Sequence, residues 1–283
     1  MHVERSHREA AAAGKKDSIL PLTSGEIHLW LAFWEAISEE RLLVAYRELL
    51  NAREREEESR FYFAKDRRGY LVTRALMRTV LSRYACVDPK DWVFSTNPFG
   101  RPHIVNAEAT DGLSFSVSHT QGLIVLGVSK GRPLGVDVEN FATRDISIDI
   151  AEHCLAPQEV AALREASDHQ QQYSFFEYWT LKESYIKARG MGFSLPLDRF
   201  CFHFVDDHAL DLVLGSELGD DPSRWQFWQL QPTPQHLLAV CAERLNPQPL
   251  RLLVREIIPT VSERMLAPKL LRTSEMPEEE LHS

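Results

Sequence analysis

The stretch from residue 114 to residue 139, SFSVSHTQGLIVLGVSKGRPLGVDVE, decides the fold of this chain. Two of its apolar runs, Ser114 to Ser118 and Leu123 to Ser129, are separated by Thr120-Gln121-Gly122, which is typical of a β-hairpin. A third run, Leu134 to Val138, follows a Gly-Arg-Pro turn and predicts another strand. The middle of the chain is therefore expected to form antiparallel β-structure.

Two acids lie in the last of these predicted strands. Alternate side chains of a strand share a face, so Asp137 and Glu139 point the same way while Val136 and Val138 point into the core. Two carboxylates on one face repel each other unless a cation lies between them, and hard oxygen ligands suit Mg²⁺. An exposed edge strand with two solvated acids would show the same pattern, so the pair alone does not establish a metal site.

The segment WTLKESYIKARG, residues 179–190, predicts a helix that ends at Gly190. Glu183 and Lys187 lie one turn apart on the same face, away from the apolar stripe, so they can act together at a site. The same spacing also describes an ordinary surface ion pair, which contributes only a few tenths of a kcal/mol.

Helical and strand patterns alternate along the rest of the chain. Residues 66–84, DRRGYLVTRALMRTVLSRY, have helical spacing, and their arginines either serve a phosphate or form a solvated face. Strands are expected at 27–33, 200–204, 225–230, 236–242 and 250–256, and further helices at 40–50 and 170–189. Helices and antiparallel strands therefore occur twice.

The composition indicates a globular protein. The 283 residues are 44% hydrophobic, and the net charge of −9 argues against binding to a nucleic-acid backbone. We found no apolar run of about 18 residues and no secretory signal, so we expect a cytoplasmic protein without a membrane segment. The four cysteines form no CxxC pair and are expected to be reduced and inert.

Two further segments could meet a ligand. Phe115-Ser116-Val117-Ser118-His119-Thr120 places hydroxyls and an imidazole at a hairpin tip, and Pro98-Phe99-Gly100-Arg101-Pro102 is a turn that would hold an arginine. A lone loop histidine and a turn of this kind are more often structural than functional. Neither segment decides a function by itself.

Taken in order, FGRP, FSVSHT, GVDVE and WTLKESYIKARG resemble the successive motifs of the surfactin-type phosphopantetheinyl transferases. The resemblance covers about residues 27–244 and implies an α+β fold. Two similar halves would be related by a pseudo-twofold axis, each a small antiparallel sheet packed on a long helix, with coenzyme A in the cleft between them. We expect mobile tails at 1–24 and 259–283, an N-terminal half at 25–134 and a C-terminal half at 135–258 that carries the metal ligands.

The resemblance also implies roles for individual residues. Asp137, Glu139 and Glu183 correspond to the family's Mg²⁺ ligands, and Glu183 and Lys187 are the catalytic candidates. The residues expected to contact coenzyme A are Arg60, Arg101, Ser118, His119, Lys182 and Lys187. Relatives place basic residues before the first long helix, but here the arginines of 53–60 are interleaved with glutamates, so which of them binds the 3′-phosphate stays open.

The implied activity is Mg²⁺-dependent transfer of 4′-phosphopantetheine from coenzyme A to a serine of an apo carrier protein, with release of 3′,5′-adenosine diphosphate. The carrier could belong to fatty-acid, polyketide or nonribosomal-peptide synthesis, and a monomer is expected. An inactive relative acting as a coenzyme A or carrier-binding adaptor is the alternative. A nucleotide transferase or hydrolase of another type is less favoured, because the chain contains neither a P-loop nor a GxGxxG motif.

Overall fold

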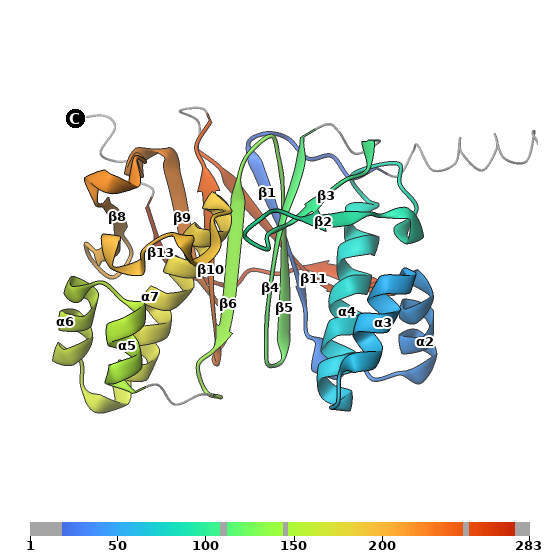
Figure 1. Ribbon diagram of the computed structural model, residues 1–283, viewed down its shortest axis with the longest axis horizontal. Helices are drawn as coiled ribbons and strands as arrows, with labels where there is room; N and C mark the ends of the chain where they lie inside the picture. Colours follow the sequence, from blue (N-terminus) through green and yellow to red (C-terminus); the bar gives the residue numbers. More distant parts are fainter. Residues whose placement is uncertain (1–18, 108–111, 144–146, 246–248, 275–283) are drawn as a thin grey trace, which may run out of the picture.

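Two β-sheets lie side by side at the centre of the computed structural model, and helices cover the outer face of each sheet (Figure 1). The structure describes residues 19–107, 112–143, 147–245 and 249–274. Within these ranges no helix is long and apolar enough to cross a membrane, and the four cysteines are free.

The N-terminal half contains a five-stranded sheet of order β12-β11-β1-β5-β4. Its strands are β1 (Glu26–Ala32), β4 (Leu113–Thr120), β5 (Leu123–Lys130), β11 (Arg251–Ile258) and β12 (Ser262–Met265). The covering helices are α2 (Glu40–Leu49), α3 (Ala52–Arg60) and α4 (Ala64–Leu81), and the short strands β2 (Phe94–Thr96) and β3 (Pro102–Ile104) form a separate ribbon.

The C-terminal half contains a four-stranded sheet of order β13-β9-β10-β6. Its strands are β6 (Leu134–Asn140), β9 (Trp225–Thr233), β10 (His236–Glu243) and β13 (Lys269–Thr273). The covering helices are α5 (Ile148–Cys154), α6 (Pro157–Glu165) and α7 (Asp168–Arg189), and β7 (Phe200–Phe204) pairs with β8 (Leu210–Leu214).

Three apolar cores hold these layers together. One lies between the five-stranded sheet and α4, where Trp30, Leu76 and Leu126 are fully buried. A second packs α7 against the four-stranded sheet. The third lies between the two sheets and joins side chains from both halves, such as Leu29 and Val240. Because alternate residues of β1 face different cores, the strand reads as a continuous apolar run in the sequence.

The predicted α+β fold of two halves, each a sheet with a long helix, is confirmed. The sheets are not purely antiparallel, since β1 pairs in parallel with β11 from Glu26↔Arg251 to Leu31↔Glu256. The hairpin of β4 and β5 and the helix ending at Gly190 are also confirmed; Gly190 adopts φ 67°, a left-handed conformation suited to glycine.

The C-terminal segment differs most from the prediction. The proposed mobile tail at 259–283 is wrong for residues 259–274, which include strands β12 and β13. Strand β11, predicted to belong to the C-terminal half, lies in the N-terminal sheet, whereas β13 returns to pair with β9. The chain end therefore crosses between the halves twice. Most of the predicted N-terminal tail, residues 1–18, lies outside the described residues.

Candidate functional site

Strand β6 and helix α7 approach each other closely at Gly135, at the junction of the two halves. A Cβ atom at this position would lie 1.9 Å from the backbone oxygen of Ser184, so no other residue fits without moving the helix or the strand. The glycine of GVDVE thereby brings Asp137, two residues further on, alongside the helix that carries Glu183 and Lys187.

Asp137 is nearly buried and pairs with Lys187. The Lys187 ammonium lies 2.6 Å from Oδ1 of Asp137, and the Ser118 hydroxyl donates to the same oxygen at 2.9 Å. The second carboxylate oxygen, Oδ2, is buried and has no hydrogen-bond partner. A buried carboxylate oxygen without a partner is costly, so this atom is suited to receive a ligand.

Glu183 faces the same junction from α7. Burial, then repulsion by Asp137 and Glu139, raises its pKa from 4.5 to about 7, although Lys187 opposes the shift. Its Oε1 atom is also buried without a hydrogen-bond partner. The electrostatic coupling shows that the three predicted acids lie in one neighbourhood although they come from a strand and a helix.

Hydroxyls of β4 connect the edge of one sheet to the edge of the other. Ser116, Ser118 and Thr120 accept hydrogen bonds from the backbone N–H groups of Val136, Val138 and Asn140, at 3.0, 3.3 and 3.1 Å. We call these three side chains the hydroxyl ladder. Because the ladder uses every second residue of each strand, it fixes the register of β6, and with it Asp137 and Glu139, against β4.

The residues fit a divalent cation by their chemistry but are not gathered around one. Hard carboxylate oxygens, two of them buried and unpartnered, are the donors that Mg²⁺ prefers. Within the described part of the chain, however, no three His, Cys, Asp or Glu side chains are already arranged to hold a metal ion. A cation between the carboxylates would offset their mutual repulsion.

The largest cavity beside these acids, of about 640 Å³, lies between α4 and the ends of β4 and β6. Residues of α4, which include Lys65, Tyr70 and Arg74, line it opposite His119 and Glu139. Desolvation by the surrounding protein, and then the positive charge of Lys187, lower the pKa of His119. The imidazole is therefore mostly neutral near pH 7. His119 thus lines the same cavity as Glu139, and its predicted contact with coenzyme A stays a prediction.

Lys65 is a cavity residue that the sequence analysis missed. Its charge lies 2.9 Å from Glu35 and over the ring of Trp34. No local signal linked it to Arg74, because residues nine positions apart point about 180° away from each other on a helix. Arg78 was expected either to serve a phosphate or to lie on a solvated face. It is fully buried and paired with Glu54, so both expectations were wrong.

A smaller cavity, of about 180 Å³, lies on the other side of the acids. Phe99, Phe115 and Ile186 give it an apolar lining, and Glu183 and Lys187 lie at its edge. Glu139 therefore lines the larger cavity together with Lys65, Asp66 and Arg74, whereas Glu183 and Lys187 line the smaller, mostly apolar one.

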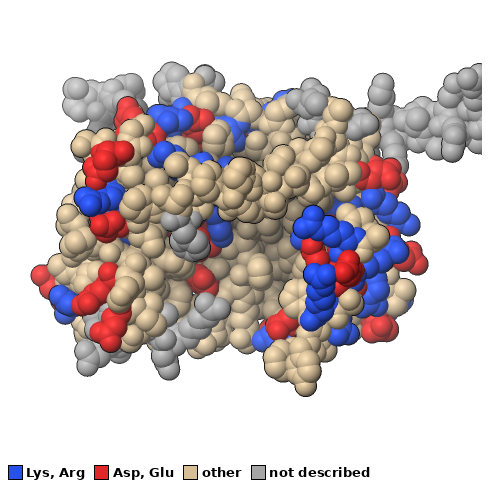
Figure 2. All heavy atoms as spheres, viewed as in Figure 1, with Lys and Arg blue, Asp and Glu red and all other residues tan. Residues whose placement is uncertain are grey.

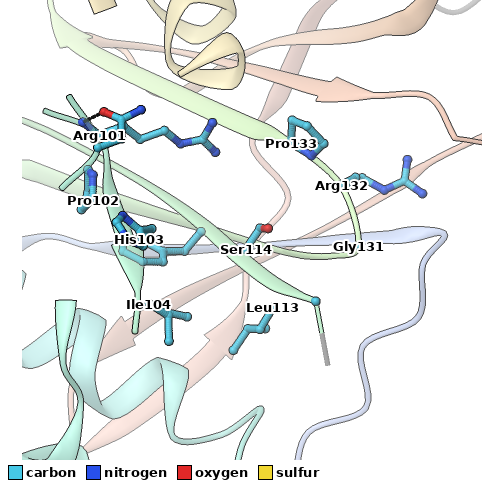
Figure 3. Close-up of a pocket in the computed structure, with 12 residues that line it drawn as sticks. Arg101, Pro102, His103, Ile104, Leu113, Ser114, Gly131, Arg132 and Pro133 are labelled. Atoms are coloured by element: carbon cyan, nitrogen blue, oxygen red, sulfur yellow. Dashed lines mark hydrogen bonds between the residues drawn. The ribbon is translucent and has the colours of Figure 1, made fainter. Parts of the chain in front are cut away.

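Arg101 of the FGRP turn ties the two halves together. Its guanidinium donates to the backbone oxygens of Ala188 at 2.9 Å and Leu134 at 3.1 Å, one on α7 and one on β6. It also borders a third cavity of about 550 Å³, shown in Figure 3, from which the side chain of Arg132 points away. A contact between Arg101 and a nucleotide stays a prediction, and the structure adds a bridging role that the motif did not indicate.

Lys182 was predicted to contact a phosphate, and the structure contradicts this. Its side chain is fully buried in the C-terminal half, where the ammonium lies 2.9 Å from Glu159 and donates to the backbone oxygens of Leu197 and Phe200. Helix geometry explains the error, because adjacent residues of a helix point about 100° apart. Glu183 faces the junction, so Lys182 turns into the core.

Arg60 and Ser118 have protein partners in the structure, and their contacts with coenzyme A stay predictions. Arg60 is exposed at the end of α3, pairs with Glu56 at 2.6 Å and does not line the cavities described above. Figure 2 shows acidic and basic side chains interleaved over α3 and α4, as the sequence suggested. The Ser118 hydroxyl donates to Asp137 and accepts from Lys187 and Val138, so all its hydrogen-bonding positions are used.

Comparisons with known proteins agree with this geometry. The family model "4'-phosphopantetheinyl transferase, N-terminal" matches residues 32–131, and the model "4'-phosphopantetheinyl transferase superfamily" matches residues 133–241. The two matches meet at residue 132, next to the turn that precedes β6.

Individual relatives extend over most of the chain. The 4'-phosphopantetheinyl transferase HetI of Nostoc sp. is 34% identical over 81% of this chain and 93% of its own length. A 4'-phosphopantetheinyl transferase of Bacillus subtilis is 31% identical over 78% of this chain and 88% of its own length. The enzyme named Sfp, from Bacillus subtilis strain 168, is 32% identical over 68% and 82%. Strand β6 and helix α7 bring the charged residues of the site together, and this chain therefore belongs to the 4'-phosphopantetheinyl transferase superfamily.

Proposed function

We propose that this enzyme transfers the 4′-phosphopantetheine group of coenzyme A to a serine of an apo carrier protein, with Mg²⁺, and releases 3′,5′-adenosine diphosphate. Family membership gives the transferred group. The observation that carries the proposal is the meeting of Asp137, Glu183 and Lys187 beside a small, mostly apolar cavity and near a larger one that Lys65 and Arg74 help to line.

The two cavities match the two chemically different ends of coenzyme A. The nucleotide end carries the 3′-phosphate, and the larger cavity offers the cations of Lys65 and Arg74 and the imidazole of His119 as hydrogen-bonding groups. The pantetheine arm is uncharged, and the smaller cavity is lined by aromatic and aliphatic side chains. The pyrophosphate between these ends would then lie beside Lys187 and the acids.

The acids are the proposed holders of Mg²⁺. Asp137 Oδ2 and Glu183 Oε1 are buried without partners, and Glu139 lines the larger cavity next to them. A bound Mg²⁺ would offset the negative charge on the phosphoryl oxygens, which is the main requirement of phosphoryl transfer.

In the reaction, the carrier serine oxygen forms a bond to the β-phosphorus of coenzyme A. The bond from this phosphorus to the bridging oxygen breaks, and 3′,5′-adenosine diphosphate leaves with the electron pair. Glu183 accepts the serine proton, since it is the carboxylate of α7 that faces the junction and its Oε1 atom has no hydrogen-bond partner in the protein. Lys187 would stabilise the negative charge that develops on the phosphoryl oxygens.

The test is to incubate the full chain with coenzyme A, Mg²⁺ and an apo carrier domain and to follow the carrier mass. We expect the carrier to gain one phosphopantetheine group, and we expect chelation of the metal with EDTA to stop the gain. Glu183→Gln should reduce the rate by about 10³-fold or more, because the amide can neither accept the proton nor bind the metal well.

The matched control is Glu165→Gln, at an exposed glutamate on α6, which should leave the rate unchanged. A carrier that never gains mass, although the protein binds coenzyme A, would refute the transfer and favour the adaptor. Full activity of Glu183→Gln would remove this residue from the site.

A further inference from the structure

The hydroxyl ladder connects each acid of β6 to one residue of β4 in a repeated pattern. The Ser118 hydroxyl accepts from the N–H of Val138 and donates to Asp137, the residue just before it. The Thr120 hydroxyl accepts from the N–H of Asn140 and donates to Glu139, again the preceding residue. The same arrangement therefore appears twice, displaced by two residues along both strands.

The first step of the ladder lacks the acid. The Ser116 hydroxyl accepts from the N–H of Val136 at 3.0 Å, but the residue that precedes Val136 is Gly135, which has no side chain to hold. The backbone connection between the two sheets is therefore common to all three steps. The bond to a carboxylate occurs only where β6 carries an acid.

The hydroxyl bonds also decide which carboxylate oxygen is free. Ser118 and Lys187 both bind Oδ1 of Asp137, which leaves the buried Oδ2 without a partner. The hydroxyl has one proton to donate, and the N–H of Val138 occupies one of its acceptor positions, so the direction of donation towards Asp137 is determined. A carboxylate that is held by one oxygen presents the other in a fixed direction.

We infer that Ser118 and Thr120 are positioning residues that orient Asp137 and Glu139 for the cation. The inference rests on the proposed function, since it concerns the metal that these acids would hold. Hydrogen bonds from neighbouring groups orient metal ligands, and loss of such a bond typically lowers metal affinity by about 10- to 100-fold. Ser118 should have the larger effect, because its bond of 2.9 Å is shorter than the 3.3 Å bond of Thr120.

The test measures binding of Mn²⁺ to the full chain by electron paramagnetic resonance, in which free Mn²⁺ gives the signal, without any carrier protein. We expect the dissociation constant for Mn²⁺ to rise about tenfold in Ser118→Ala and about threefold in Thr120→Val. Thr120→Ser keeps the hydroxyl and should restore the parent value.

Ser116→Ala is the matched control. It removes a hydroxyl that accepts a backbone N–H of β6, as Ser118 does, but this hydroxyl holds no carboxylate. It should lower the thermal midpoint about as much as Ser118→Ala while leaving Mn²⁺ binding unchanged. If Ser118→Ala and Thr120→Val bind Mn²⁺ as Ser116→Ala does, the positioning role is wrong.

A separate variant distinguishes this failure from failure of the proposed function. Asp137→Asn removes a proposed ligand and should weaken Mn²⁺ binding more than any ladder variant does. If Asp137→Asn binds Mn²⁺ like the parent, the acids do not hold the metal, and both the metal site and the positioning role are overturned. If only the ladder variants behave like the parent, the metal site stands without the positioning role.

Discussion

Two lysines of α7 lie five residues apart in one motif, and their surroundings are opposite. Lys182 has no exposed side-chain surface and pairs with Glu159, which is equally buried, inside the C-terminal half. Lys187 keeps 28% of its side chain exposed and pairs with Asp137 at the junction of the halves. Both are lysine–carboxylate pairs of similar length, at 2.9 and 2.6 Å.

The difference lies in what else each carboxylate binds. Glu159 accepts the backbone N–H groups of Ala156 and Phe202 in addition to Lys182, so every charge there is used inside the fold. Asp137 keeps one buried oxygen without a partner, next to cavities. An ion pair that satisfies all its atoms is structural, whereas an ion pair that leaves an oxygen free is suited to binding.

The largest effect that would sharpen this comparison is expected in Lys182→Met. The variant leaves Glu159 buried without its cation, and loss of one partner of a buried pair typically costs about 3–5 kcal/mol. Urea denaturation should show this loss in the free energy of unfolding. Lys182→Met combined with Glu159→Gln removes both charges and should recover part of it. An unchanged midpoint for the single variant would contradict the structural role.

The pH dependence of stability tests Glu183, which lies next to Lys182 in α7 but points about 100° away from it. Its pKa is about 7 in the folded chain against an ordinary value of 4.5, so the charged form destabilises the metal-free protein. This contribution is absent below pH 4.5 and grows to about 3 kcal/mol as the pH rises through 7. Metal-free Glu183→Gln should therefore be more stable than the parent at pH 8 and similar to it near pH 4.5. Equal stability at both pH values would show that neither burial nor the neighbouring acids raise the pKa of Glu183.

Lys187→Ala should show the reverse of Lys182→Met. We expect the transfer rate to fall about 100-fold, because a charge near the phosphoryl oxygens is lost. The free energy of unfolding should fall less than in Lys182→Met, since Lys187 is partly exposed and water can reach Asp137 from the junction. Carrier mass and urea denaturation, measured on the same preparation, check both statements. A larger loss of stability than in Lys182→Met would contradict the proposed difference between the structural Lys182 and the functional Lys187.

The smallest effect concerns two arginines of the N-terminal half. Arg74 lines the larger cavity, whereas Arg60 is exposed and pairs with Glu56. Arg74→Ala should raise the KM for coenzyme A about tenfold through loss of a charge-assisted contact, and Arg60→Ala should change it less than twofold. Steady-state kinetics with varied coenzyme A distinguish them. An equal rise of KM in both variants would show that Arg60 of α3 also contributes to the binding of coenzyme A.

The sequence predicted the elements whose patterns are local. The hairpin of β4 and β5, the strand β6 and the long helix ending at Gly190 depend on apolar alternation, turn residues and a helix stop within a few residues of each other. The three acids were predicted to meet, and their mutual effect on the pKa of Glu183 agrees with this. Their roles as metal ligands remain predictions.

The remaining features depend on contacts between distant segments. Lys182 was misassigned because its partner, Glu159, comes from another helix, and no local pattern identifies that pair. Lys65 was missed because its importance comes from facing β4 across a cavity. The strands after residue 258 are short and mostly polar, and only their pairing with β11 and β9 makes them strands.

The parallel pairing of β1 with β11 has a consequence for synthesis on the ribosome. The first strand made lies beside one that begins at Arg251, so more than 200 residues must emerge before the ladder from Glu26 to Leu31 is complete. Until then the nascent chain presents a bare apolar strand edge, of the kind that recruits chaperones or joins other chains. We therefore expect separately produced halves of this enzyme to aggregate. Co-expressed halves can pair β1 with β11 and so complement each other.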